Sequence, residues 1–143
     1  MTSLTLEHHN RQQLAKLLAD QAWTVACLCA RWCDVCNAYR ASFEQWAARH
    51  PDMHFIWIDI EDQADVVGDF DVENFPTLLI QRGDIVAFLG TVLPDARLTE
   101  LLLLAQVEKS DAELQAEASS NEERRTWQRD CNLRVRLNEA GGL

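Results

Sequence analysis

Hydrophobic positions along the chain alternate between strand-like and helix-like patterns. Continuous apolar runs such as TVACLCA predict buried strands, whereas apolar residues spaced three and four apart predict amphipathic helices. The predicted strands are Leu4–Leu6, Thr24–Ala30, Met53–Ile60, Thr77–Gln81 and Ile85–Leu89. The predicted helices are His8–Ala19, a helix from Cys33 that ends before Pro51, a short one at Asp62–Phe70 with Asp62 as its cap, and one at about Asp95–Glu108.

The order of these elements predicts an α/β fold. Strands that alternate with helices favour a mixed, mostly parallel central sheet with helices on both faces. The turn Arg82-Gly83-Asp84 joins the last two strands as an antiparallel hairpin, because glycine permits the tight turn. The leucine run at 101–104 is expected to lie on the buried face of the last helix.

The composition changes after Glu108. We therefore expect a domain at residues 1–108 and a charged, mostly helical extension at 109–143 with one or two largely solvated helices. Ser110–Glu113 and Ser120–Glu123 both match a helix-start capping pattern. The extension could pack back on the domain, self-associate or bind a protein partner, and its Cys131 is expected to be a surface thiol. Its large apolar residues are Leu114, Trp127, Leu133, Val135 and Leu137.

Composition and charge narrow the function classes. The 143 residues are 48% hydrophobic and 25% charged, with a net charge of −10. No Lys or Arg occurs between His50 and Arg82, where seven acidic residues cluster from Asp59 to Glu73, so a nucleic-acid partner is not expected. No apolar run has the length of a membrane span, and the N-terminal residues lack the pattern of a signal peptide. We therefore expect a cytoplasmic protein with no membrane partner.

Four of the five cysteines lie in the segment CLCARWCDVC. Cys33 and Cys36 stand where a predicted strand ends and a helix begins, and a helix N-terminus stabilises a thiolate. Such a pair suits thiol–disulfide exchange, in which the first cysteine attacks and the second resolves the mixed disulfide. Cys27 and Cys29 point to one face of the strand and are interpreted as core thiols. A zinc site is less favoured because a second cysteine pair of ribbon type is missing.

On these residues the sequence resembles the thioredoxin family. The resemblance covers about residues 4–108 and rests on Trp32-Cys33-x-x-Cys36, Ile58-Asp59-Ile60, Asn74-Phe75-Pro76-Thr77, Gly83 and Gly90. It implies a thioredoxin-like fold and a disulfide reductase that acts on disulfide-containing proteins, is restored by an upstream thiol reductase, and uses no cofactor beyond a redox-active Cys33–Cys36 disulfide. It also implies that Pro76 is the cis-proline, that Phe75 receives the substrate peptide, and that Trp32 packs beside the nucleophile.

Three departures from the family pattern bear on the site. Asp34-Val35 replaces the Gly-Pro of the best-known thioredoxin loop, and the Asp34 carboxylate opposes a neighbouring thiolate by like-charge repulsion, which predicts a more reducing couple. Cys27 stands where the family commonly buries a proton-transferring aspartate, and Trp57 where it often has the paired lysine. Slower exchange than in a standard thioredoxin is therefore expected.

A second class of function remains open from the sequence. The acidic segment 59–73 and the charged extension suit a thioredoxin-fold binding module or chaperone-like adaptor, because a catalyst alone needs neither. The intact Cys33 and Cys36 favour the catalyst.

Overall fold

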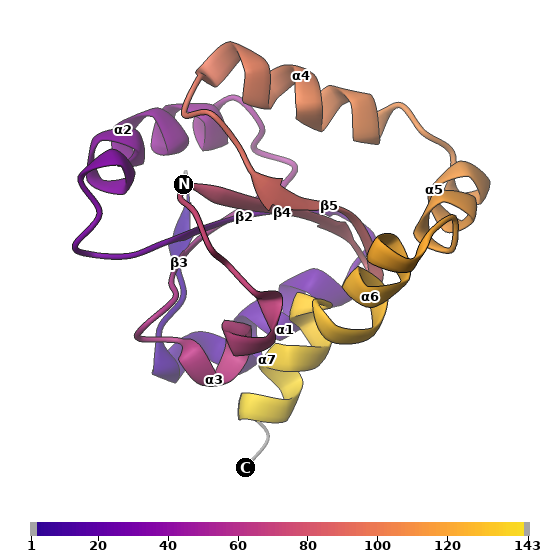
Figure 1. The fold of residues 1–143 in the computed structure, drawn as a ribbon, viewed down its shortest axis with the longest axis horizontal. Coiled ribbons are helices and arrows are strands. Elements are labelled where there is room, and N and C mark those ends of the chain that lie inside the picture. Colours follow the sequence, from indigo (N-terminus) through magenta and orange to yellow (C-terminus); the bar gives the residue numbers. More distant parts are fainter. Residues whose placement is uncertain (1–2, 142–143) are drawn as a thin grey trace.

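The computed structural model describes residues 3–141, which form one five-stranded mixed sheet with helices on both faces (Figure 1). The strand order is β1-β3-β2-β4-β5. β1 and β2 both run parallel to β3, whereas β4 runs antiparallel to β2 and to β5. The strands are β1 (Leu4–Thr5), β2 (Trp23–Cys29), β3 (His54–Asp59), β4 (Thr77–Arg82) and β5 (Ile85–Thr91).

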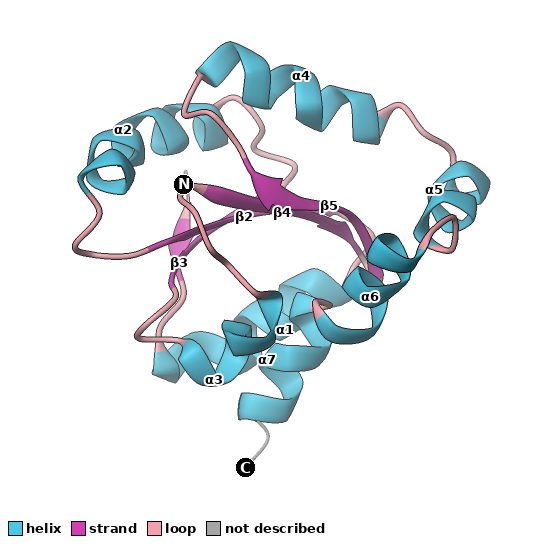
Figure 2. Cartoon of the chain, in the orientation of Figure 1, coloured by secondary structure: helices cyan, strands magenta, loops and turns pink. Residues whose placement is uncertain are grey.

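The helices cover the sheet in two layers. α2 and α4 lie on one face, α1, α3 and α7 lie on the other, and α5 and α6 stand beside β5 (Figures 1 and 2). This arrangement confirms the predicted α/β class. The helices are α1 (Arg11–Ala19), α2 (Asp34–Ala48), α3 (Ala64–Val67), α4 (Ala96–Val107), α5 (Asp111–Ala118), α6 (Glu122–Asp130) and α7 (Leu133–Gly141), with short 3-10 turns at His8–Asn10 and Gly68–Phe70.

The central strand β2 divides the core into two clusters. All seven of its residues are buried, as its unbroken apolar sequence predicts. Cys27 and Cys29 face the cluster under α2 and α4, whereas Ala26 and Leu28 face the cluster under α1 and α7. The expectation that Cys27 and Cys29 share one face of the strand is therefore confirmed.

The residues after Glu108 pack onto the sheet instead of standing in solvent. Leu114 completes the α2–α4 cluster, while Cys131, Leu133 and Leu137 are buried against α1 and α3. The expectation of one or two largely solvated helices is correct only in part. α5 and α6 together bury only Leu114, but a third helix, α7, forms and is anchored by buried leucines four residues apart. Cys131 is also not a surface thiol, since only 3% of it is exposed.

A buried polar network fixes the extension to the β4–β5 hairpin. The Gln81 side chain, which is fully buried, donates to Asn132 Oδ1 (2.8 Å) and accepts from the Leu133 backbone N–H (2.9 Å). The Gln128 amide donates to the Val86 carbonyl (2.8 Å) and accepts from the Val86 N–H (2.9 Å). Gln128 thus satisfies the backbone of β5 at the edge of the sheet, where an unpaired strand would otherwise be exposed.

Some local predictions are corrected by the structure. Only Leu103 of the leucine run is fully buried, whereas Leu101 is 54% exposed, because four consecutive leucines point around a full helical turn. The cap of α3 is Gln63 and not Asp62, and the cap of α6 is Asn121 and not Ser120. The predicted capping box at Ser110 is confirmed. Among residues 3–141, no helix combines the length and apolar character that crossing a membrane requires.

Candidate active site

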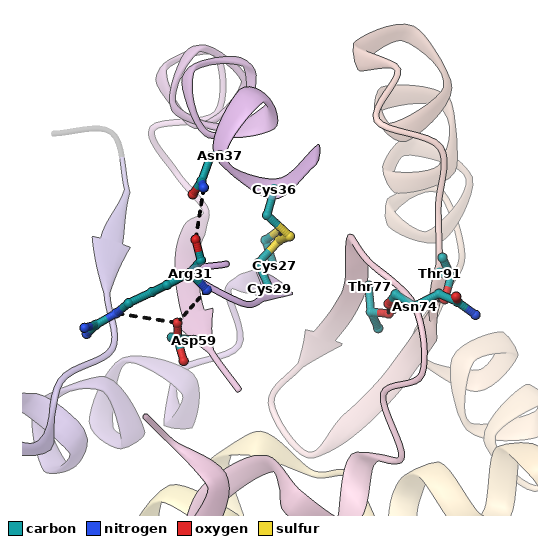
Figure 3. Close-up of a disulfide and its surroundings, with 9 residues drawn as sticks. All are labelled: Cys27, Cys29, Arg31, Cys36, Asn37, Asp59, Asn74, Thr77 and Thr91. Atoms are coloured by element: carbon teal, nitrogen blue, oxygen red, sulfur yellow. Dashed lines mark hydrogen bonds and ion pairs between the residues drawn. A yellow bond between two sulfur atoms is a disulfide. The ribbon is translucent and has the colours of Figure 1, made fainter. Parts of the chain in front are cut away.

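The loop that carries the cysteine motif joins the end of β2 to the start of α2 and is held at two points (Figure 3). Asp59, at the end of β3, accepts from the Arg31 backbone N–H (3.1 Å) and lies 3.6 Å from the Arg31 guanidinium. Asn37 Nδ2 donates to the Arg31 carbonyl (3.0 Å). From the sequence, Asp59 was interpreted as a strand end and as part of the acidic cluster, and the positioning roles of Asp59 and Asn37 were not predicted.

Cys33 is the N-cap residue of α2 and has a free, partly exposed thiol. Its carbonyl accepts from the Asn37 N–H (3.1 Å), so the side chain stands where the first N–H groups of the helix are unpaired. A helix N-terminus is a general site of attraction for negative charge, and Cys33 is the cysteine that stands at the start of this fifteen-residue helix. Asp34 and Val35 follow in the first turn, and both are exposed.

Cys36 lies in the same first turn, is fully buried, and forms a disulfide with Cys29 at the end of β2 (Figure 3). Their Cα atoms are 5.8 Å apart, a normal separation for a disulfide. The structure therefore does not contain the Cys33–Cys36 disulfide that the resemblance implied, and the interpretation of Cys29 as only a core thiol is wrong. The sequence predicts that the strand and the helix follow each other, but it does not show that the side chains of Cys29 and Cys36 face each other.

Cys27 lies beside this disulfide but outside it. Its Sγ is 3.7 Å from the Cys29 Sγ. Burial raises the pKa of the Cys27 thiol far above its usual range, and the positive charge of Arg40 opposes that rise only in part. The Arg40 guanidinium lies 4.5 Å from the centre of the Trp57 ring. A cation is thus present near the position where the family lysine was missing, but it comes from α2.

The aromatic rings of Trp32, which precedes Cys33, and Phe75, which precedes Pro76, are in contact. Their ring centroids are 5.6 Å apart in an edge-to-face arrangement, and Trp32 is 66% exposed. The Phe75–Pro76 peptide bond is cis, the geometry that the resemblance implied. Thr77 Oγ1 donates to the Asn74 carbonyl (2.7 Å) and so holds the turn before the proline (Figure 3).

The residues of this site are suited to thiol–disulfide exchange. Within residues 3–141, no three His, Cys, Asp or Glu side chains come together as a metal site would require. The site has an accessible thiol at a helix N-terminus, buried sulfurs one turn behind it, and an adjacent aromatic and cis-proline turn. This combination defines a thiol–disulfide oxidoreductase.

The comparisons with known proteins agree with this class. The family model described as Thioredoxin matches residues 4–102, so the chain belongs to the thioredoxin family. A protein of Streptomyces coelicolor provisionally named thioredoxin 2 is 29% identical over 115 residues, which cover 76% of this chain and 86% of that protein. A thioredoxin H-type of Picea mariana is 26% identical over 110 residues, or 76% of this chain and 88% of that protein.

The fold is shared with solved thioredoxin structures. A poplar thioredoxin h superposes with a TM-score of 0.66 at 17% identity, and the match covers 77% of this chain and 100% of the poplar chain. The thioredoxin-like fold predicted from the sequence is therefore confirmed.

Proposed function

We propose that the chain reduces disulfide bonds in other proteins, with Cys33 as the attacking thiolate and Cys36 as the resolving thiol. The observation that supports this most is the unequal exposure of the cysteines. Among the five, only Cys33 is not buried, and it follows the exposed Trp32, whose ring contacts Phe75 of the cis-proline turn. A protein disulfide can therefore reach Cys33 and no other sulfur.

The proposed reaction has two exchange steps. The Cys33 thiolate attacks one sulfur of the substrate disulfide, and the other substrate sulfur leaves as a thiolate. The Cys36 thiolate then attacks the Cys33 Sγ and releases the second substrate thiolate. The substrate gains two electrons, the protein loses two, and an upstream thiol reductase returns them. No organic cofactor or metal takes part in this scheme.

Neighbouring residues set the rate and direction of exchange in the proposal. The exposed Asp34 opposes the thiolate, which favours a reductant. Cys27, which replaces the family's buried acid, holds its proton too tightly to assist proton transfer well. We place the protein in the cytoplasm, because a partly exposed free thiol persists in a reducing compartment. Neither a membrane nor a nucleic acid is among the proposed partners.

Reduction of insulin disulfides, with dithiothreitol as the electron source, tests the assignment. Cys33→Ser should reduce the rate to that of dithiothreitol alone, because the only accessible sulfur is lost. Cys131→Ser is the matched control, since Cys131 is buried under α7 in the other core cluster, and it should keep the wild-type rate. Wild-type activity in Cys33→Ser would overturn the proposal.

Partner binding is a second candidate function, and one feature favours it. A pocket of about 380 Å³ is lined by acidic residues of the 69–73 segment and by Glu123 and Trp127 of α6. The pocket lies between the acidic segment and the extension, the two features that suggested an adaptor. Its negative charge suits a basic peptide. A labelled lysine-rich peptide should bind the Cys33→Ser protein and lose affinity when Asp71 and Glu73 are replaced by Asn and Gln. Equal affinity for both proteins would argue against a binding role.

A further inference from the structure

The active site holds a third sulfur that the two-cysteine scheme does not use. Cys29 ends β2, opposite Asp59 of β3, and its carbonyl accepts from the Ile60 N–H (2.9 Å). Cys36 is fixed in the first turn of α2. Both sulfurs therefore belong to regular elements that the sheet and helix hold in place, and they are bonded to each other (Figure 3).

Cys36 lies within reach of two partners. Cys33, three residues earlier, is the N-cap of the same helix, and side chains at this spacing lie on one face about 5–6 Å apart at Cβ. Cys29 approaches the same sulfur from the strand, at a Cα separation of 5.8 Å. One sulfur between two possible partners is the arrangement that an internal disulfide exchange needs.

Burial separates the roles of the three. Only 1% of Cys29 and none of Cys36 is exposed, so an external thiol cannot attack their disulfide directly. The only partly exposed cysteine is Cys33, and it is free in this structure. Electrons must therefore enter or leave the buried disulfide through Cys33.

We propose that Cys29 is a third redox cysteine, which takes the disulfide from the Cys33–Cys36 pair and leaves Cys33 as a free thiol in the oxidised protein. This inference rests on the proposed function, because it assumes that Cys33 and Cys36 have been oxidised by a substrate. The Cys29 thiolate attacks the Cys36 Sγ, the Cys33–Cys36 bond breaks, and the Cys29–Cys36 bond forms. Cys33 leaves as a thiolate and takes up the proton that Cys29 lost. No oxidant is consumed, because one disulfide replaces another.

The exchange has a chemical consequence. In a two-cysteine enzyme the oxidised form has no accessible thiol and must wait for its reductase. Here the oxidised form keeps an accessible nucleophile, so Cys33 can attack a second disulfide and form a mixed disulfide. Attack of Cys33 on Cys36 reverses the exchange and re-forms the Cys33–Cys36 disulfide, which includes the partly exposed cysteine.

Trypsin makes the two disulfides easy to distinguish. Cleavage after Lys16, Arg31 and Arg40 places Cys29 on the peptide 17–31, whereas Cys33 and Cys36 share the peptide 32–40. A Cys33–Cys36 disulfide stays within one peptide, and a Cys29–Cys36 disulfide links two. The experiment oxidises the reduced protein with insulin, blocks free thiols with iodoacetamide before unfolding, and maps the peptides by mass spectrometry.

The expected result is a linked pair of peptides with Cys33 alkylated. Cys29→Ala should lose the linked pair and show only the internal disulfide with no alkylated Cys33. Cys27→Ala is the matched control, because Cys27 is equally buried on the same face of β2, and it should keep the linked pair. If the wild-type protein shows the internal disulfide and no linked pair, the inference is overturned. This outcome does not depend on whether Cys29→Ala folds.

The two proposals fail in different ways. If insulin reduction depends on Cys33 but only the internal disulfide forms, the proposal for Cys29 is refuted and the proposed reductase function stands. If insulin reduction does not depend on Cys33, both proposals are refuted.

Discussion

Replacing Leu137 by alanine tests whether α7 is part of one cooperative fold. Leu137 has no exposed surface and lies in the same buried cluster as Leu14 and Leu18 of α1. Truncating a buried leucine to alanine costs about 2–5 kcal/mol, because transfer free energy is lost and a cavity remains. α7 packs mainly against α1 and α3, and these neighbouring helices can relax to fill part of the cavity. We therefore expect a loss of about 2–3 kcal/mol.

Thermal unfolding followed by far-ultraviolet circular dichroism measures this loss. For a chain of this size, a destabilisation of 1 kcal/mol lowers Tm by about 3 °C, so Leu137→Ala should unfold about 6–9 °C below the wild type. A reducing buffer removes any contribution from the disulfide. Urea unfolding should show the same loss as a lower midpoint with an unchanged slope.

Leu101→Ala is the matched control. It makes the same substitution in a helix of similar length, but Leu101 is 54% exposed, so its stability should stay within about 0.5 kcal/mol of the wild type. Equal Tm values for the two variants would refute the packing of α7 described above. Two separate unfolding transitions in the wild type would refute the single cooperative unit.

Three further predictions concern the hairpin, the acid range and the substrate rim. Gln81→Ala should cost about 1–3 kcal/mol in urea unfolding, because its buried partners in the extension lose their hydrogen bonds. The hydrogen bond from Arg134 holds the pKa of Asp84 below its usual value of 3.8, so this carboxylate stabilises the fold above that pH and ceases to do so as the pH falls through its lowered folded-state value. Asp84→Asn should therefore be less stable than the wild type at neutral pH, by no more than about 1 kcal/mol for this partly exposed pair, and equally stable in strong acid. Trp32→Ala should raise KM for insulin about tenfold, the equivalent of about 1.4 kcal/mol, with kcat nearly unchanged; a fall in kcat alone would contradict a docking role.

The sheet and the thiol motif could be predicted because their signals are local. A continuous apolar run such as Thr24–Ala30 is explained only by burial on both faces, and the structure buries all of β2. Cys33 comes three residues after the end of a predicted strand and opens a predicted helix, so its place at a helix N-terminus followed from its neighbours alone. No contact between distant residues was needed for either conclusion.

The Cys29–Cys36 disulfide could not be predicted, because it depends on how two elements meet. The two cysteines are seven positions apart in the sequence, and the chain between them turns from β2 into α2. The direction of that turn is set by the contacts of Asp59 and Asn37 with Arg31, which no periodicity reveals. The extension escaped prediction for a similar reason. Leu133 and Leu137 are too few to define an apolar helix face until α1 supplies the surface that they cover.

The place of the extension bears on substrate choice as much as on stability. The poplar thioredoxin is covered completely by 77% of this chain, and the thioredoxin family match ends at residue 102, so the three C-terminal helices are what this chain adds to the shared fold. Arg136 of α7 pairs with Asp69 (2.8 Å), and Trp127 of α6 lines a pocket with Asn74, the residue before Phe75. The added helices therefore border the turn to which the proposed function assigns substrate binding. If the extension influences substrate choice, we expect its effect where α6 and the 69–74 segment meet, because both line the same pocket.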